Sequence, residues 1–274
     1  MKITFLGAGA FGTALESIAL YNGHETKFYD PIKFPAISLG NALNGAEVVV
    51  YCAPSDQAAK LLPKLDKSIP LICASKGFLS LEPFSDFKHF SALSGAGFAK
   101  DIKAALDIGN EKATKISLAG TSELIEQLFS TEKITIEYTK DTLGVLLCGA
   151  LKNIYAIGAG YHSSDASMTY LKGAILEMSD ILSYNGADKD TLRLSCGVAD
   201  LVLSCNEGSR NYRYGEELKN SDHIKGRRLP DSNLIEGVSA IMSLDNYSDF
   251  KVPASATTFY DIVELVKKEE HAAE

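Results

Sequence analysis

The chain has 274 residues, enough for one large domain or two ordinary ones, each with its own core. Hydrophobic residues make up 46% of the chain and charged residues 23%, which is typical of a soluble globular protein. The formal net charge of −8 argues against non-specific binding of nucleic acid. Such an acidic protein still binds anions where positive charge is gathered locally.

Cysteine and histidine give no sign of a metal site. The five cysteines show no C-x-x-C spacing and lie mostly in apolar runs, so we expect reduced, buried thiols. The five histidines are scattered along the chain, and we expect no bound metal. Met1 leads directly into a predicted strand without a preceding basic or apolar segment. We therefore expect no signal peptide and a cytoplasmic protein.

The N-terminal stretch carries a glycine motif in a specific context. A β-rich run, Lys2–Leu6, leads into G-x-G-x-x-G with glycines at Gly7, Gly9 and Gly12, and a helical stretch follows. A second predicted strand, Glu25–Tyr29, ends at Asp30. Strand, glycine turn, helix, strand and acidic residue form the fingerprint of a dinucleotide site, with the pyrophosphate at the helix N-terminus. Asp30 is placed to accept hydrogen bonds from the adenosine ribose and to repel a 2′-phosphate, which favours NAD over NADP.

Further strands alternate with helical stretches as far as residue 138. Their near-continuous apolar runs predict a mostly parallel sheet covered on both faces, that is, a Rossmann-like, doubly wound α/β fold. The predicted strands are Glu47–Cys52, Pro70–Ala74, His89–Leu93, Lys115–Ala119 and Lys133–Tyr138. Ligands of such sheets bind beyond the carboxyl ends of the strands. Lys76 lies at one of these ends, where it is either an anion-binding cation or an ordinary surface lysine.

The alternation stops at Asp141, and only helical patterns follow. We therefore predict two domains, a dinucleotide-binding domain at 1–141 and an all-helical domain at 142–274. The predicted helices cover 142–161, 167–184, 188–204, 212–220, 232–243 and 253–269.

The stretch Leu143–Tyr161 is apolar apart from Lys152 near its middle. It is about long enough to span a bilayer, but its four glycines and its central lysine argue for a helix buried in protein. A buried lysine serves either in a structural ion pair or in proton chemistry and anion binding, and the sequence leaves both interpretations open.

The second half of the chain has two further sets of candidate site residues, one in an apolar segment and one in a loop. Asp200 lies in an apolar segment and is therefore either paired or functional. Ser209, Arg210 and Asn211 open a predicted helix with a hydroxyl, a guanidinium and an amide, which suits a phosphate but is also ordinary in a loop. A basic cluster at Lys225, Arg227 and Arg228 is interpreted as a solvated loop.

With these pieces in order, the chain resembles the bacterial-type NAD(P)-dependent glycerol-3-phosphate dehydrogenases from Lys2 to about Gly237. The motifs that carry the resemblance are GAGAFGTAL at 7–15, APS at 53–55, ASKGF at 74–78, LSGAGFAKD at 93–101, GALKN at 149–153, GVADLVLSC at 197–205, SRNYRYG at 209–215 and EG at 236–237.

The resemblance implies roles for individual residues. It implies that Lys152 is the catalytic proton donor and acceptor, and that dihydroxyacetone phosphate and sn-glycerol 3-phosphate are interconverted with NAD(P)H. The substrate contacts that it implies are Lys76, Gly95, Asp200, Ser209, Arg210 and Asn211. The cofactor contacts that it adds to the glycine motif and Asp30 are Ala10, Phe11, Lys76, Ala99, Arg210, Leu234 and Glu236. It also implies a homodimer and a supply of glycerol 3-phosphate for phospholipid synthesis.

The sequence departs from the family pattern in several ways: the connection between Asp30 and Glu47 is abbreviated, the C-terminus is short, and two short motifs differ. Ala96-Gly97 stands where the family usually has Pro-Ser, which removes or replaces one hydroxyl contact to the substrate. Asp30-Pro31 stands where the family commonly has an arginine, so we expect NAD, with NADP as the alternative. Two rival interpretations remain. The first is a reductase of the β-hydroxyacid or 6-phosphogluconate type, which has K-x-x-x-N on one helix face; it is disfavoured because Lys152 and Asn153 are adjacent and point in different directions. The second is a sensor that binds NAD(H) without turnover.

Overall fold

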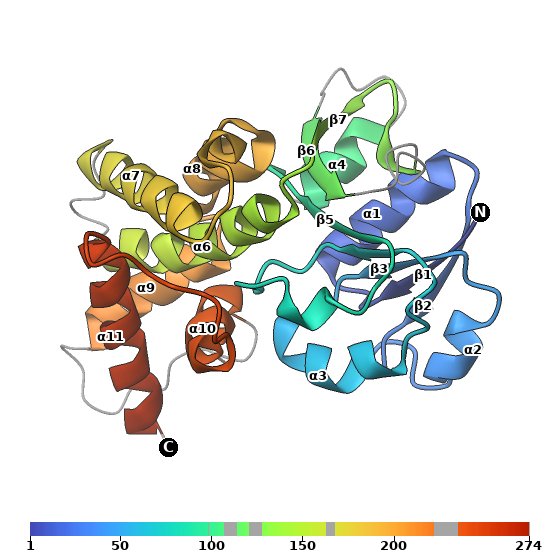
Figure 1. Cartoon of the computed structure of the whole chain (residues 1–274), viewed down its shortest axis with the longest axis horizontal. Helices are drawn as coiled ribbons and strands as arrows, with labels where there is room; N and C mark the ends of the chain where they lie inside the picture. The colour runs from blue at the N-terminus through green and yellow to red at the C-terminus, as the bar shows by residue number, and fades with distance from the viewer. Residues whose placement is uncertain (98, 107–113, 121–127, 163–167, 222–234, 274) are drawn as a thin grey trace.

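The structure is a computed structural model that describes residues 1–97, 99–106, 114–120, 128–162, 168–221 and 235–273. Figure 1 shows a sheet with its covering helices on one side of the molecule and a group of helices on the other, with helix α6 between them. The strands are β1 (Lys2–Leu6), β2 (Glu25–Tyr29), β3 (Val48–Tyr51), β4 (Leu71–Cys73), β5 (Phe90–Ser94), β6 (Thr114–Gly120) and β7 (Ile134–Thr139). The α-helices are α1 (Ala10–Tyr21), α2 (Leu39–Leu43), α3 (Ala58–Leu61), α4 (Ala99–Leu106), α6 (Thr142–Tyr161), α7 (Met168–Tyr184), α8 (Asp200–Ser204), α9 (Arg210–Ser221), α10 (Glu236–Met242) and α11 (Thr257–Ala273).

The strands form one seven-stranded sheet in the order β2-β1-β3-β4-β5-β6-β7. All neighbouring pairs are parallel except β5 and β6, which are antiparallel. This confirms the predicted Rossmann-like, mostly parallel sheet, and each strand agrees with its predicted limits to within one residue. The order reverses between β1 and β3, so the carboxyl ends of these strands flank the glycine turn after β1, where ligands of open α/β sheets bind.

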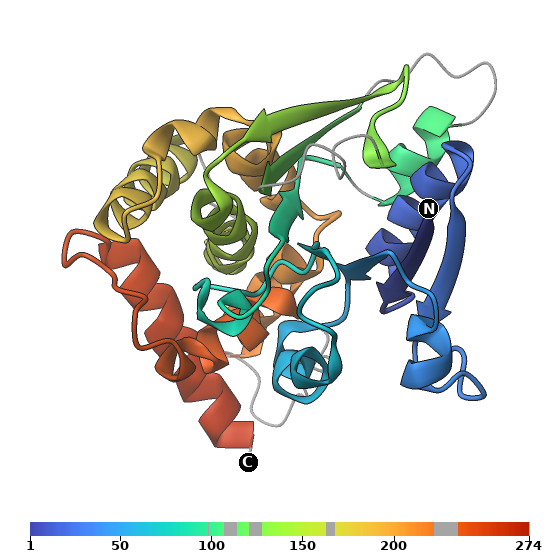
Figure 2. The same cartoon turned by 45° about the vertical axis from the view of Figure 1, so that its right-hand side comes forward.

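The central strands β1, β3, β4 and β5 are buried on both faces of the sheet, which explains their apolar runs. In β3, Val48 and Val50 belong to a core shared with α1 and α4, whereas Val49 and Tyr51 belong to a core shared with α6. Figure 2 shows α1 and α4 on one side of the sheet and α6 on the other. The sheet therefore holds the glycine turn and the lysine-bearing helix in a fixed relation.

Helix α6 is the central element of the second half. Its predicted limits are confirmed, and the Asp141 carboxylate caps its N-terminus by accepting a hydrogen bond from Gly144 N at 2.9 Å. By length and composition it is the one helix among the described residues that could cross a membrane, but 94% of its most apolar window is buried inside the protein. It contacts β5 and β6 as well as α7 to α11, so it is a core helix of the fold.

The predicted single helix at 188–204 is wrong. The segment consists of a 3₁₀ helix at Lys189–Arg193, a π-helical turn at Ser195–Ala199 and then α8. The break lies at Gly197, whose φ of −93° and ψ of −117° are not helical. A Cβ at Gly197 would lie 2.2 Å from the carbonyl oxygen of Leu192, so the close return of the backbone requires glycine. Because of this break, α8 begins as a separate short helix at Asp200.

The sheet is complete with β7, and all the described elements from Thr142 onward are helical. The division into domains at 1–141 and 142–274 follows this change but stays a prediction.

Candidate active site

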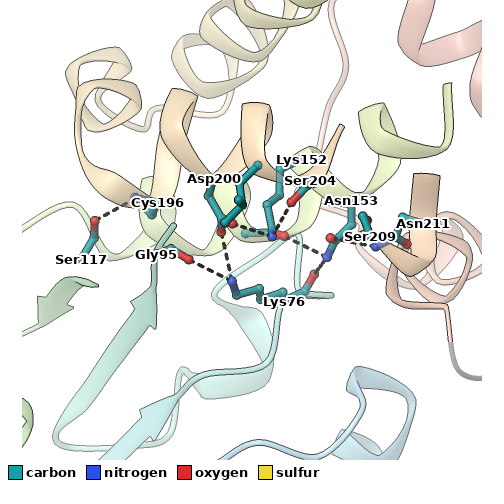
Figure 3. A network of polar contacts seen from close by, with 12 residues as sticks. Lys76, Gly95, Ser117, Lys152, Asn153, Cys196, Asp200, Ser204, Ser209 and Asn211 are labelled. Atoms are coloured by element: carbon teal, nitrogen blue, oxygen red, sulfur yellow. Dashed lines mark hydrogen bonds and ion pairs between the residues drawn. The ribbon is translucent and has the colours of Figure 1, made fainter. Parts of the chain in front are cut away.

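Three charged side chains from distant parts of the chain meet at the seam between sheet and helices (Figure 3). Lys152 Nζ lies 2.8 Å from Asp200 Oδ1, and Lys76 Nζ lies 3.0 Å from Asp200 Oδ2. The side chains of Lys152 and Asp200 are 7% and 2% exposed, and that of Lys76 is 14% exposed. One carboxylate therefore holds two ammonium groups and leaves the cluster with one net positive charge.

Each member of this cluster is positioned by a different element. Lys76 follows β4 at the carboxyl edge of the sheet, Lys152 lies in the middle of α6, and Asp200 is the first residue of α8. Lys76 Nζ also donates a hydrogen bond to the carbonyl oxygen of Gly95, which follows β5, at 3.3 Å. The structure thus brings together four of the predicted site residues, and Lys76 is not an ordinary surface lysine.

Ser204 completes the surroundings of Lys152, and sequence analysis did not identify it. Its Oγ accepts a hydrogen bond from Lys152 Nζ at 2.8 Å. Ser204 lies four positions after Asp200, which places both on the same face of α8. That spacing was the only available signal.

Burial lowers the pKa of Lys152 to about 8. The neighbouring ammonium of Lys76 contributes to this lowering, whereas the charge of Asp200 acts in the opposite direction, and the value of about 8 includes all of these effects. A lysine with this pKa is mostly protonated near neutral pH and gives up its proton far more easily than an exposed lysine does. The arrangement is therefore both an ion pair and a group suited to proton transfer.

A chain of amides ties three helices together beside the cluster (Figure 3). Asn211 Nδ2 donates to Asn153 Oδ1 at 2.9 Å, and Asn211 Oδ1 accepts from Gly237 N at 2.8 Å. Asn153 Nδ2 donates to the carbonyl oxygen of Lys76 at 3.2 Å. Asn211 thus joins the starts of α9 and α10 to α6. Asn153 faces these amides while Lys152 faces Asp200, as predicted from their adjacency.

The rest of the predicted phosphate-binding segment lies at the start of α9. Ser209 is buried, and its carbonyl oxygen accepts a hydrogen bond from Arg213 N at 3.1 Å. The Arg210 guanidinium is half exposed and forms an ion pair with Glu236 at 3.0 Å. Leu234, with the predicted basic cluster Lys225, Arg227 and Arg228, lies outside the described residues.

The glycine turn fits a dinucleotide. Gly7 has a φ of +104°, and a Cβ there would lie 2.8 Å from Ala53 N. A Cβ at Gly12 would lie 2.4 Å from the carbonyl oxygen of Gly7, so α1 packs closely on the turn. By contrast, a Cβ at Gly9 would meet nothing within 4 Å. Gly9 is the N-cap of α1, where the first N–H groups have no partner within the helix, and the open space beside Gly9 suits a pyrophosphate.

Phe11 connects the glycine turn to the lysine cluster. Lys76 Nζ lies over its ring, 4.9 Å from the centroid. Ala10 and Phe11 are the first residues of α1, Ala99 is the first of α4, and Glu236 is the first of α10. Their proposed cofactor contacts stay predictions.

Asp30 lies at the end of β2 beside the glycine turn, as predicted. Its Oδ2 accepts from Ala8 N at 2.9 Å, and its Oδ1 accepts from Ile32 N and Lys33 N at 3.0 Å each. Partial burial acts to raise the pKa of Asp30, but these hydrogen bonds and the Lys33 charge outweigh it and lower the pKa. The carboxylate is therefore charged and already engaged with the backbone.

All five cysteines are free thiols. No group of three or more His, Cys, Asp or Glu side chains within the described ranges is placed to hold a metal ion.

The fold and these sites define a nicotinamide-dinucleotide-dependent oxidoreductase. A family model described as the C-terminus of NAD-dependent glycerol-3-phosphate dehydrogenase matches residues 141–273. A glycerol-3-phosphate dehydrogenase [NAD(P)+] of Shewanella amazonensis is 30% identical over 86% of this chain and 82% of its own length, and a Salmonella newport enzyme of the same name is 29% identical with 86% and 83% covered. The chain belongs to the family of NAD(P)-dependent glycerol-3-phosphate dehydrogenases.

Solved structures agree on the fold. The crystal structure of glycerol-3-phosphate dehydrogenase from Coxiella burnetii has a TM-score of 0.75 at 21% identity, with 98% of both chains covered. A ketopantoate reductase from Ralstonia eutropha shares the fold more distantly, with a TM-score of 0.56 at 16% identity and 99% and 100% covered.

Proposed function

We propose that this protein interconverts dihydroxyacetone phosphate and sn-glycerol 3-phosphate with NAD(P)H. The observation that carries the proposal is the cluster of Lys152, Asp200 and Lys76. The cluster lies beside the glycine turn, because Lys76 Nζ contacts the ring of Phe11 at the start of α1. The names of the relatives supply the substrate pair. The cluster supplies a proton donor and positive charge at the place where the turn would deliver a nicotinamide.

Lys152 acts as the proton donor and acceptor in this proposal. The dinucleotide supplies a hydride when it is bound. As C2 of the ketone is reduced, negative charge develops on its oxygen, and the Lys152 ammonium stabilises that charge and transfers a proton to it. In the oxidative direction neutral Lys152 removes the proton from the C2 hydroxyl. Asp200 and Ser204 hold the Lys152 Nζ in place through contacts of 2.8 Å each.

The phosphate group is assigned to the start of α9. Arg210 supplies a half-exposed guanidinium, and Ser209 lies before the helix N-terminus. Asn211 contributes by holding α9 against α6, because both ends of its amide contact protein groups. Binding of the remote phosphate would orient the carbonyl towards Lys152. Lys76 adds a second cation, and the Gly95 carbonyl fixes its position.

Several broader assignments belong to the same proposal. Residues 1–141 would form the dinucleotide domain and residues 142–274 the catalytic domain, with α6 at the seam. The protein would work as a homodimer in the cytoplasm and supply glycerol 3-phosphate for phospholipid synthesis. These assignments rest on the family to which the chain belongs.

The direct test is the loss of NADH absorbance in the presence of dihydroxyacetone phosphate. We expect rapid oxidation with the phosphate ester and little with unphosphorylated dihydroxyacetone, because the latter lacks the group that Arg210 would bind. The measurement is repeated with NADPH. If NADH binds but no oxidation follows, the proposal fails and an NAD(H)-binding sensor becomes the better interpretation.

A further inference from the structure

The π-helical turn at Ser195–Ala199 leads directly into α8, so its position decides where Asp200 lies. The break at Gly197 interrupts the helical geometry of this turn. Asp200 must nevertheless place its two carboxylate oxygens 2.8 Å from Lys152 Nζ and 3.0 Å from Lys76 Nζ. The geometry of the lysine cluster therefore depends on the groups that anchor the turn.

The sheet anchors the turn through Ser117 of β6 (Figure 3). Ser117 Oγ accepts a hydrogen bond from Cys196 N at 3.0 Å, and it forms a second hydrogen bond with Ser195 Oγ at 2.9 Å. Ser117 and Cys196 are fully buried, and Ser195 is 6% exposed. A buried N–H group that loses its acceptor keeps the full cost of its desolvation, so the two hydrogen bonds constrain the turn strongly.

Glu137 of β7 holds the same end of the turn. Its Oε2 accepts a hydrogen bond from Ser195 N at 2.6 Å, and its Oε1 lies 3.2 Å from the ammonium of Lys115. Partial burial acts to raise the pKa of Glu137, but hydrogen bonds from Ser195 and Lys115 outweigh it and lower the pKa. The acceptor is therefore an ionised carboxylate, which binds an N–H group more strongly than a neutral oxygen does.

We propose that Ser117 and Glu137 are positioning residues of the reaction, which act through Asp200. They hold the first two residues of the turn to β6 and β7, while Asp200 follows its last residue and holds the two ammonium groups. The turn also packs against α6, the helix that carries Lys152. A shift of the turn would move the carboxylate relative to Lys152, and a displacement of about 1 Å can cost about 10²-fold in rate. The kinetic part of this proposal rests on the proposed function.

Lys152 reports the position of Asp200 through its own titration. The main charged groups that act on its ammonium are Asp200 of α8, Lys76 after β4 and Glu236 of α10. The Cys205 thiol, which follows α8, also interacts with it. The Asp200 carboxylate favours the charged form of Lys152, so a larger separation lowers the pKa of Lys152 and moves the decline of the reductive rate to lower pH.

The test measures the titration of Lys152 by NMR of protein with isotope-labelled lysine, assigned with the Lys152→Met variant. The second measurement is the pH profile of kcat/KM for the reduction of dihydroxyacetone phosphate. The variants are Ser117→Ala and Glu137→Ala, and the latter changes a partly exposed side chain, so it tests the proposal even if the former does not fold. Glu137→Gln is the conservative variant, because its amide oxygen can still accept from Ser195 N.

Two controls match these variants. Lys115→Met breaks the ion pair with Glu137 and leaves the hydrogen bond from Ser195 N in place. Ser94→Ala removes a buried hydroxyl of β5 directly opposite Ser117, and Ser94 Oγ has no hydrogen-bond partner within the part of the chain that the structure describes. Both controls should leave the pKa of Lys152 unchanged.

We expect Ser117→Ala and Glu137→Ala to lower the pKa of Lys152 by about half a pH unit or more and kcat/KM by at least about tenfold. Glu137→Gln should restore most of both values, and the dissociation constant of NADH should not change in any variant. In an Asp200→Asn background, the two alanine substitutions should shift the pKa of Lys152 no further, because they act through the missing charge.

Three results would each overturn the proposal. The first is a wild-type titration of Lys152 in both alanine variants, since a lower unfolding temperature alone would indicate a purely structural role. The second is a shift that persists in the Asp200→Asn background. The third is an equal shift in Glu137→Gln and Glu137→Ala. If the wild-type protein reduces no triose phosphate, the proposed reaction fails, and the NMR titration still decides how Asp200 is positioned.

Discussion

The Nζ atom of Lys152 and the Oδ1 atom of Asp200 lie 2.8 Å apart, although the two residues are separated by 48 positions in the sequence. The other oxygen of the same carboxylate holds Lys76 at 3.0 Å. Asp200 therefore joins the middle of α6 to the carboxyl edge of the sheet. Burying one anion between two cations keeps the site positive, which favours a phosphorylated substrate and a developing alkoxide.

Replacing Lys152 with methionine should remove most of the turnover. Methionine fills a similar volume in the buried site but cannot transfer a proton, so kcat should fall by about 10²- to 10⁴-fold. NADH binding should be retained, because the glycine turn is untouched, and this is measured by fluorescence titration of the same sample. Wild-type turnover in Lys152→Met would end the assignment of Lys152 as proton donor.

The pH dependence should differ between the two directions of the reaction. The pKa of Lys152 is about 8. Reduction requires the protonated amine, so its rate should fall as the pH rises through about 8, whereas oxidation requires the neutral amine and should accelerate over the same range. The check is kcat/KM in both directions between about pH 6 and pH 10. Parallel profiles in the two directions would contradict the model of a single proton-transferring lysine.

Asp200→Asn should lower both the stability of the protein and the pKa of Lys152. Without the carboxylate charge the two lysines repel each other, which costs about 3 kcal/mol of unfolding free energy by analogy with other broken buried pairs. The pKa of Lys152 should fall, because an anion that favours its charged form is gone, so the decline of the reductive rate should begin at lower pH. Urea unfolding and the pH profile measure the two effects. The control is Asp190→Asn, since Asp190 and its partner Arg193 are both largely exposed.

Much of this fold could be predicted because its signals are local. The strands are continuous apolar runs, and α6 begins at the capping residue Asp141. The glycine turn, too, is set by neighbouring residues. The sequence therefore predicted the sheet and the central helix correctly.

The features that could not be predicted depend on contacts between distant residues. Whether Lys152 was paired could not be decided without knowing that Asp200 lies beside it. The helix break at Gly197 depends on the close approach of the Leu192 backbone, which no periodicity reveals. The backbone partners of Asp30 could not be predicted for the same reason, because Ala8 and Lys33 are recognisable as partners only once the loop after β2 is folded.

Arg210→Ala should weaken the binding of the phosphorylated substrate specifically. Loss of a half-exposed guanidinium contact should raise KM for dihydroxyacetone phosphate by about tenfold. The slow reaction of unphosphorylated dihydroxyacetone should not change, because that substrate makes no such contact. Arg213→Ala, an exposed arginine of the same helix, is the control. Equal effects of Arg210→Ala on both substrates would place the guanidinium elsewhere than on the phosphate.

The two glycines that flank the start of α1 should respond differently to alanine. Gly12→Ala would place a methyl group 2.4 Å from the carbonyl oxygen of Gly7. This clash should lower the free energy of unfolding by about 1–3 kcal/mol. At Gly9 the φ of −65° and ψ of 177° suit any residue, and the added methyl group meets nothing within 4 Å. Gly9→Ala should therefore unfold at the wild-type temperature or slightly above it.

The same Gly9→Ala variant should nevertheless bind NADH several-fold more weakly, because its methyl group occupies the space through which the pyrophosphate approaches the N-terminus of α1. Thermal unfolding and NADH titration of the two variants separate the packing role of Gly12 from the ligand role of Gly9. Unchanged NADH affinity in a stable Gly9→Ala protein would mean that the dinucleotide does not cross this turn, and the assignment of the site would have to be abandoned.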